Sequence, residues 1–255
     1  MSPKADTFSY TVEPFDTDFT NHLSWSVLGR RILSTATFHA QKRGFDQLTL
    51  DGTPHLWVLS RLVVEMDTWP TVGDTYNITT WVKDRFRQFT TRYFDITDGQ
   101  GNLMGQALTI WAMINSKTRL PADLGTLFGD TFDPYLDAER PCNIRRGSRI
   151  RVESTVPTCS RTVRYSDIDI NGHLNSIRYI EYLLDCFPQQ RYEQETVHRL
   201  EMDYCAEGRI SDQLDIYLDN KDDGTSQAEI RRHQDNVTAC KSSITFQKKT
   251  QNTDS

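Results

Sequence analysis

The sequence lacks the long apolar run that a membrane-spanning helix requires. No stretch of its 255 residues approaches the roughly 20 apolar residues of such a helix. Its first residues, MSPKADTFSYTVEPFD, have neither the apolar stretch of a secretory signal nor the Arg- and Ser-rich character of a transit peptide. We therefore expect no membrane span and a cytoplasmic protein.

Cysteines are few and are not paired in the sequence. None forms a Cys-x-x-Cys pair, whereas a disulfide framework or a structural zinc site needs close, paired spacing. We therefore expect five free thiols. They are Cys142, Cys159, Cys186, Cys205 and Cys240.

An excess of positive charge is absent as well. The chain carries 29 Lys and Arg against 35 Asp and Glu, a formal net charge of -6, which argues against a general nucleic-acid binder. Aromatic residues, in contrast, make up 11% of the chain, which argues against a disordered protein. The length suits one large globular domain or two of modest size.

The pattern in the first half of the chain predicts one helix followed by an antiparallel meander. Ser24 is a suitable cap, Leu28 and Ile32 recur at helical spacing, and Gly44 is the expected stop. Apolar and β-branched runs then predict strands, with a hairpin turn at 98–101. These strands are expected at residues 57–64, 76–82, 88–96 and 108–114.

The second half repeats this plan. A helix is expected from about Asn175 to the breaker at Phe187 and Pro188, after a short strand and a polar loop. A second meander follows the helix. The strands of this half are expected at residues 161–165, 198–205, 213–218, 227–233 and 237–246.

A shared motif lies directly ahead of each predicted helix. Residues 16–24 read DTDFTNHLS and residues 167–175 read DIDINGHLN, so both fit D-x-D-x-x-x-H-L-[S/N] at a constant offset of 151. Because the motif takes the same place in both halves, it indicates a tandem repeat.

The periodicity fades between the two halves, where prolines, a glycine and a basic cluster occur. We interpret residues 1–130 as an N-terminal domain, 131–156 as an Arg-rich linker, 157–250 as a C-terminal domain and 251–255 as a polar tail. The cluster is either a solvated part of the linker or a basic face for an acidic partner. Its members are Arg140, Arg145, Arg146, Arg149 and Arg151.

The stretch richest in potential catalytic side chains is residues 166–175, where two carboxylates, two amides and an imidazole precede an apolar helix. One interpretation is a helix-capping loop, because Asn175 is a good cap and carboxylates favour the positive helix end. A metal site is disfavoured, since His-rich metal spacings are absent and Asn is a weak ligand for transition metals. Ser166 lies in no Gly-x-Ser-x-Gly elbow, which disfavours a serine hydrolase.

Four segments of the chain carry a further pattern, and they are LWVLSR (56–61), GDTYNITTWV (73–82), IWAMINSKTR (110–119) and SDIDINGHLN with IRYI (166–180). Together they resemble motifs of the acyl-carrier-protein (ACP) thioesterases of plants, the FatA and FatB types, and of their bacterial relatives. The resemblance implies an α+β fold, a tandem or double hotdog in which each unit wraps an antiparallel sheet around a long helix. It also implies fatty acyl-ACP hydrolysis without a metal or cofactor.

The resemblance places the family's catalytic residues on Asp169, Asn171, His173 and Glu207, the last on a strand after the central helix. Glu207 is then the candidate general base for a water molecule. His173 and Asn171 would hold that water or stabilise the oxyanion, and Asp169 would orient Asn171 or fix the His173 tautomer.

One departure from the family argues against a cysteine nucleophile. The plant enzymes have a cysteine after the catalytic glutamate, and here that position is Gly208. Cys205 is nearby but does not match the family's cysteine. We expect it to be a buried structural thiol.

The two copies of the repeat differ at the catalytic positions. In the first copy Asp18 and His22 remain, but Thr20 replaces Asn171 and, at an offset of 138, Trp69 takes the place of Glu207. We expect one active site, built on the C-terminal copy, with the N-terminal half supplying the acyl pocket.

Two other functions fit the same motifs. An acyl-CoA thioesterase would act on the same phosphopantetheine thioester, and the arginine cluster at 140–151 is what would favour the acidic carrier protein instead. A non-catalytic acyl-binding hotdog protein is the other alternative. The chain is expected to be a monomer with internal pairing or a homodimer.

Overall fold

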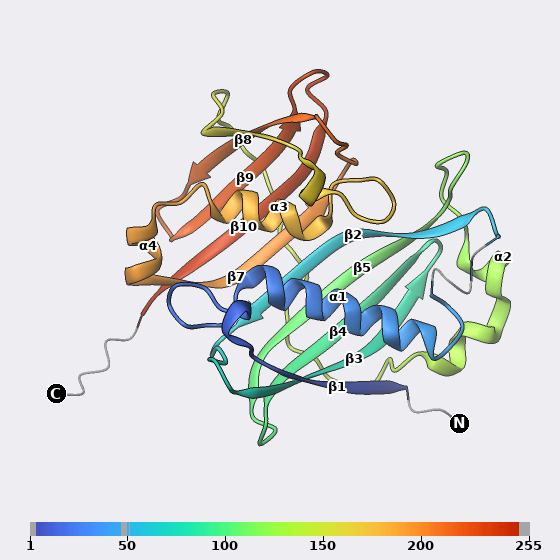
Figure 1. The fold of residues 1–255 in the computed structure, drawn as a ribbon. Coiled ribbons are helices and arrows are strands. Elements are labelled where there is room, and N and C mark those ends of the chain that lie inside the picture. Colours follow the sequence, from blue (N-terminus) through green and yellow to red (C-terminus); the bar gives the residue numbers. More distant parts are fainter. Residues whose placement is uncertain (1–3, 47–49, 51, 250–255) are drawn as a thin grey trace. The chain divides into compact units, whose positions relative to one another are not determined.

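The computed structural model describes residues 4–46, 50 and 52–249, and the chain forms two compact units, Met1–Arg146 and Gly147–Ser255 (Figure 1). Within the described residues, each unit has an antiparallel sheet of five strands with one main helix lying across it. The fold is therefore α+β, a tandem hotdog, as the resemblance implied. The boundary between the units falls inside the segment 131–156.

The first unit has the sheet order β1-β3-β4-β5-β2, with antiparallel neighbours throughout. Two short 3-10 turns, η1 (Pro14–Asp16) and η2 (Gly129–Tyr135), accompany the strands and helices. Its other elements are β1 (Ala5–Thr11), α1 (Trp25–Gln41), β2 (His55–Met66), β3 (Thr75–Phe86), β4 (Phe89–Asp98), β5 (Leu103–Asn115) and α2 (Leu124–Phe128).

Helix α1 begins and ends where the sequence predicts. The Ser24 hydroxyl accepts a hydrogen bond from the Val27 N–H at 3.4 Å, which satisfies one of the unpaired donors of the first turn. Leu28 and Ile32 are buried on its apolar face. The chain turns away after Gln41, and Gly44 adopts a left-handed backbone with φ of 74°.

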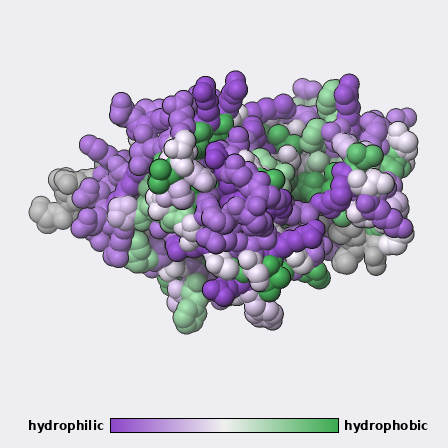
Figure 2. Space-filling model, turned by 90° about the horizontal axis from the view of Figure 1, so that it is seen from above, coloured by the Kyte–Doolittle hydropathy of each residue, from purple (hydrophilic) through white to green (hydrophobic). Residues whose placement is uncertain are grey.

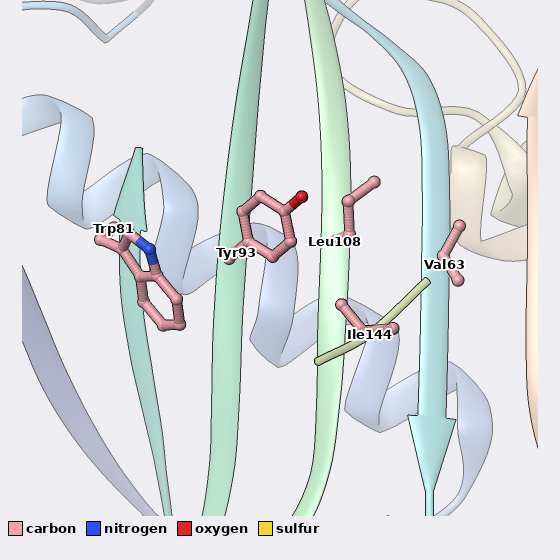
Figure 3. Packing of buried hydrophobic residues seen from close by; sticks show 5 residues of the cluster. All are labelled: Val63, Trp81, Tyr93, Leu108 and Ile144. Carbon is pink, nitrogen blue, oxygen red and sulfur yellow. The ribbon is translucent and has the colours of Figure 1, made fainter. Parts of the chain in front are cut away.

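A row of buried side chains crosses the first sheet on the face away from α1. Trp81 pairs with Tyr93, Tyr93 with Leu108, and Leu108 with Val63, so four neighbouring strands each contribute one residue (Figure 3). Ile144, from the segment after η2, packs on this row and is itself buried. The linker therefore covers this row of side chains.

The second unit has the sheet order β7-β10-β9-β8-β6, again antiparallel. A 3-10 turn, η3 (Tyr165–Asp167), precedes its main helix. The other elements are β6 (Cys159–Thr162), α3 (Ser176–Leu184), α4 (Gln189–Gln194), β7 (Glu195–Tyr204), β8 (Gln213–Asn220), β9 (Thr225–Arg232) and β10 (Thr238–Lys248).

The loops before α1 and α3 have the same backbone. The Asp18 N–H donates to the His22 carbonyl at 2.9 Å, and the Asp169 N–H donates to the His173 carbonyl at 2.8 Å. The residue before each histidine has a left-handed backbone, with φ of 64° in the first copy and 78° in the second. The sequence repeat is thus a structural repeat.

A second pair of matched turns follows β2 and β7. The Asp74 carboxylate accepts a hydrogen bond from the Thr71 N–H at 2.8 Å, and the Asp212 carboxylate accepts one from the Arg209 N–H at 2.8 Å. These turns correspond at the offset of 138 that the sequence comparison uses.

The linker makes specific contacts with residues of each unit. In the first unit the Arg140 guanidinium lies 4.5 Å from the centre of the Trp81 ring and 3.5 Å from the Asp95 carboxylate. In the second unit the Ser148 N–H donates to Glu201 Oε2 at 2.6 Å. Segments without helix or strand periodicity can therefore still be fixed by polar and ring contacts.

Three elements were not predicted from the sequence pattern. Strand β1 lies in the opening stretch that reads as polar, where only Phe8 and Tyr10 alternate with hydrophilic residues, and it pairs with β3 as an edge strand. Helices α2 and α4 have five and six residues, too few for a helical period to show.

No helix within the part of the chain that the structure describes is long and apolar enough to cross a membrane.

Large apolar side chains are mostly buried, but several lie open to solvent. On the face in Figure 2, hydrophilic side chains predominate and hydrophobic ones form separate patches. Some of the exposed residues belong to the two matched loops. They are Phe15 and Phe19 in the first loop and Tyr165 and Ile170 in the second.

A buried histidine should make the protein sensitive to acid. His39 on α1 is 1% exposed, its Nε2 lies 3.1 Å from the Lys4 carbonyl, and burial together with nearby Arg92 and Arg43 lowers its pKa from 6.5 to about 3. As pH falls from 6.5 toward 3, the unfolded chain binds a proton that the folded chain does not, so stability falls over that window.

We expect the free energy of unfolding to drop by about 2 kcal/mol from this source between pH 7 and pH 5. Urea denaturation at both pH values measures it. The variant His39→Gln should lose this component of the pH dependence, although its stability at pH 7 will differ. An equal pH dependence in the two proteins would contradict the assignment.

Candidate active site

The loop before α3 is built by its own polar side chains. The Asn175 side chain caps α3 by accepting the Ile177 N–H at 2.9 Å. Asp169 Oδ1 accepts the backbone N–H groups of Asn171 at 2.8 Å and of His173 at 3.2 Å. The capping interpretation is therefore correct for Asn175, and the Asp169 carboxylate fixes the backbone that carries His173.

Glu207 is brought to this loop from another element. It lies three residues past the end of β7, in the connection to β8, and not on a strand as the resemblance implied. The Leu174 N–H donates to the Gly208 carbonyl at 2.8 Å and ties that connection to the loop. As a result, His173 Nε2 and Glu207 Oε2 lie 3.2 Å apart.

The two side chains are open enough to meet a substrate. Those of His173 and Glu207 are 27% and 31% exposed, so water reaches both. A carboxylate and an imidazole within hydrogen-bond reach can hold a water molecule and take up its proton. Asn171, in the same loop, is exposed.

Asp169 holds Asn171, one of its two expected roles, but does so through the backbone. Its hydrogen bonds among the described residues go to the backbone of Asn171 and His173, not to the imidazole ring or the amide group. It therefore positions both residues through the main chain and does not select the His173 tautomer by direct contact.

Asp167, the first aspartate of the motif, supports the same loop. It is buried, accepts the Arg164 N–H at 2.7 Å, and lies 3.6 Å from the Arg178 guanidinium. Hydrogen bonding to Glu181 and the nearby Glu181 and Asp167 charges raise the pKa of Arg178 above its usual value. Its contacts are structural ones.

Two residues that the sequence did not single out hold the Glu207 connection. The Tyr179 hydroxyl accepts the Gly208 N–H at 3.1 Å, and Arg232 donates to the Glu207 carbonyl at 2.9 Å. Tyr179 lies in the IRYI segment that resembles the family motif, but its bond to Gly208 was not predicted, because a tyrosine among apolar helix residues is expected in a core.

The position of the family's cysteine has little room here. A Cβ added at Gly208 would lie 3.1 Å from the Tyr179 hydroxyl and 3.2 Å from the Leu174 Cβ. The expectation that Cys205 is buried was wrong, because Cys205 directly follows β7 and is exposed. The fully buried thiol is Cys240 on β10, and burial raises its pKa.

The first copy lacks the acid–base pair. The Thr20 hydroxyl donates to Asp18 Oδ1 at 2.6 Å and lies 3.0 Å from His22 Nδ1. The Leu23 N–H donates to the Pro70 carbonyl at 3.0 Å, the counterpart of the bond from Leu174 to Gly208. This bond puts Trp69, the residue before Pro70, in the place that Glu207 takes in the second copy.

The linker arginines are partly neutralised. Arg140 is paired with Asp95, Arg146 lies 3.3 Å from Asp84, and Arg151 lies 3.7 Å from Glu153. The first three arginines of the cluster belong to the first unit and the last two to the second unit.

Among the described residues, no group of three or more His, Cys, Asp or Glu side chains is arranged to hold a metal ion.

Family models match most of the chain. The model of the acyl-ACP thioesterase N-terminal domain matches residues 4–127, and that of the C-terminal domain matches residues 154–251. The chain belongs to the acyl-ACP thioesterase family. Asp169, Asn171, His173 and Glu207 all fall within the C-terminal match.

Plant members of the family are distant in sequence. The acyl-[acyl-carrier-protein] hydrolase FATB3 of Cuphea viscosissima is 25% identical over 218 residues, covering 79% of this chain and 51% of that protein. Oleoyl-acyl carrier protein thioesterase 1 of Arabidopsis thaliana is 26% identical over 195 residues, covering 69% and 53%. The chain thus spans about half the length of the curated relatives it matches.

Solved structures of the family cover nearly the whole chain. An acyl-ACP thioesterase from Bacteroides thetaiotaomicron has a TM-score of 0.89 and 40% identity, covering 96% of this chain and 98% of that one. The 12:0-ACP thioesterase from Umbellularia californica has a TM-score of 0.84 at 16% identity, covering 98% and 99%, and shows the shared fold.

Proposed function

We propose that this protein hydrolyses fatty acyl thioesters of acyl carrier protein and releases the free fatty acid. The observation that carries the proposal is the 3.2 Å approach of His173 Nε2 to Glu207 Oε2 at the start of α3. Only the second copy of the repeat has this pair, so we assign one active site to each chain.

In the proposed reaction, Glu207 accepts a proton from a water molecule that His173 helps to orient. The water oxygen forms a bond to the thioester carbonyl carbon, and collapse of the tetrahedral intermediate breaks the C–S bond. The departing thiolate receives the proton that Glu207 removed. We assign stabilisation of the oxyanion to the Asn171 amide and the positive end of α3.

Carrier protein is the proposed form of the substrate because the named relatives are acyl-ACP hydrolases and thioesterases. We propose that the positive charge of the 140–151 cluster attracts the acidic carrier, and that the N-terminal unit holds the acyl chain. The five free thiols support a reducing compartment such as the cytoplasm.

A hydrolysis assay tests this proposal. Acyl-ACP substrates of several chain lengths are compared with acyl-CoA of the same lengths, and free thiol release is measured. We expect kcat/KM for at least one acyl-ACP to exceed that of its matched acyl-CoA about tenfold or more. Faster turnover of acyl-CoA would indicate an acyl-CoA thioesterase, and binding without hydrolysis of either would indicate a non-catalytic module.

A further inference from the structure

The connection that carries Glu207 is held by polar contacts on three sides. Leu174 binds the Gly208 carbonyl, the Tyr179 hydroxyl accepts the Gly208 N–H, and Arg232 donates to the Glu207 carbonyl at 2.9 Å. The Arg232 guanidinium is itself fixed by Asp235 at 2.7 and 3.2 Å. Asp235 and Arg232 thus form a brace that holds the main chain of Glu207.

Tyr179 links the connection to the helix that follows His173. Its side chain is buried, and burial raises its pKa, so the phenol stays neutral. Its ring packs edge-on against Tyr204 at 5.9 Å, and the Tyr204 hydroxyl donates to the Ser176 carbonyl at the start of α3. The start of α3 and the Glu207 connection are therefore one packed assembly.

The first copy of the repeat provides an internal comparison. At the offset of 151, Tyr179 corresponds to Leu28, which has no hydroxyl group. The matched bonds from Leu23 and Leu174 make Pro70 the counterpart of Gly208, and proline has no N–H. Both partners of this hydrogen bond are thus replaced in the copy that has no Glu207.

The brace from β9 is replaced as well. In the second sheet Arg232 pairs with Leu214, and in the first sheet the counterpart of Leu214, Tyr76, pairs with Asp98. An acidic residue stands where the catalytic copy has a guanidinium. The copy with Glu207 therefore has the Tyr179 hydroxyl, the Gly208 N–H and the Arg232 cation. The first copy lacks the counterparts of all three.

We propose that Tyr179 and Arg232 are positioning residues that hold the Glu207 carboxylate against His173. The inference rests on the proposed function and goes beyond it, because neither side chain contacts the carboxylate group. Each acts through the main chain of residues 207 and 208. A shift of about 1 Å in a catalytic group is enough to lower turnover substantially.

The test uses the full chain with Tyr179→Phe and Arg232→Gln as variants. Tyr192→Phe is the matched control for the first, because it removes a tyrosine hydroxyl that binds a backbone carbonyl elsewhere in the same unit. Arg231→Gln is the control for the second, since Arg231 is the neighbour on β9 and pairs with Glu229.

We expect each test variant to lower kcat about tenfold, with KM changed less than about twofold. The controls should keep kcat within about twofold of the parent protein. Arg232→Lys, which retains a donor and a positive charge, should recover part of the loss. Equal kcat values in the test and control variants would overturn the proposal.

A double variant separates positioning from general support of the fold. If Tyr179 acts through the Glu207 carboxylate, then adding Tyr179→Phe to Glu207→Gln should lower the residual rate less than twofold. A further tenfold loss in that background would overturn the proposal. If Tyr179→Phe fails to fold, the same cycle with Arg232→Gln decides.

The activity of the parent protein distinguishes failure of the positioning role from failure of the proposed function. If the parent hydrolyses no thioester, the proposed function fails whatever the variants do. If the parent is active and the variants match their controls, only the positioning role fails.

Discussion

Replacing Glu207 with glutamine is expected to lower kcat for acyl-ACP hydrolysis about a thousandfold, while KM changes less than about threefold. The amide has the shape of the carboxylate but cannot accept a proton from water, and general-base catalysis contributes roughly 10²–10⁴ in rate. The 3.2 Å contact to His173 Nε2 can be kept by the amide oxygen, so the loop should stay in place.

A control for this substitution lies on α4. Glu193→Gln removes an exposed carboxylate of the same unit that accepts a hydrogen bond from the Gln189 amide on the same helix, and it should leave kcat within about threefold. Single-turnover measurements with acyl-ACP compare the variants directly. Near-normal turnover of Glu207→Gln would remove Glu207 as the base.

Substituting the two repeat-related histidines should have very unequal effects. His173→Ala is expected to lower kcat about a hundredfold or more, because it removes the imidazole beside Glu207. His22→Ala should lower it less than about threefold. His22 lies near Thr20, and Trp69 takes the place of a carboxylate there.

The His22 variant serves as an internal control for the His173 variant, because both histidines lie in loops with the same backbone hydrogen bond. Steady-state kinetics of both variants, with melting temperatures to monitor folding, measure the difference. Equal losses of activity would contradict a single active site and would give the first copy a catalytic part.

The helix–meander plan was predictable because it depends on local signals. Ser24 and Asn175 each cap a helix by a hydrogen bond within their own turn, and both lie in the repeated motif. The edge strand β1 was missed for the opposite reason. Its pairing with β3 is a contact between residues about 70 positions apart, and its own sequence alternates only weakly.

Only the part of the site that lies within a local sequence motif was predictable. The residues at 169–173 lie in one short loop, whereas the approach of Glu207 depends on a bond from Leu174 to Gly208 across the fold. The exposure of Cys205 and the contact of Arg140 with Trp81 depend likewise on packing between distant segments. Such contacts leave no trace in local composition.

The shared backbone of the two loops also changes how the motif itself should be used. Because the Asp18 and Asp169 turns are alike, a search for D-x-D-x-x-x-H-L counts copies of a folding unit and not active sites. Under the proposed function, the catalytic copy is distinguished by the residue before a distant turn, which is Glu207 in the second copy and Trp69 in the first. Among relatives, an aspartate conserved at position 169 would therefore indicate only that the loop is shared. The residue at position 207 would indicate whether the proposed general base is present.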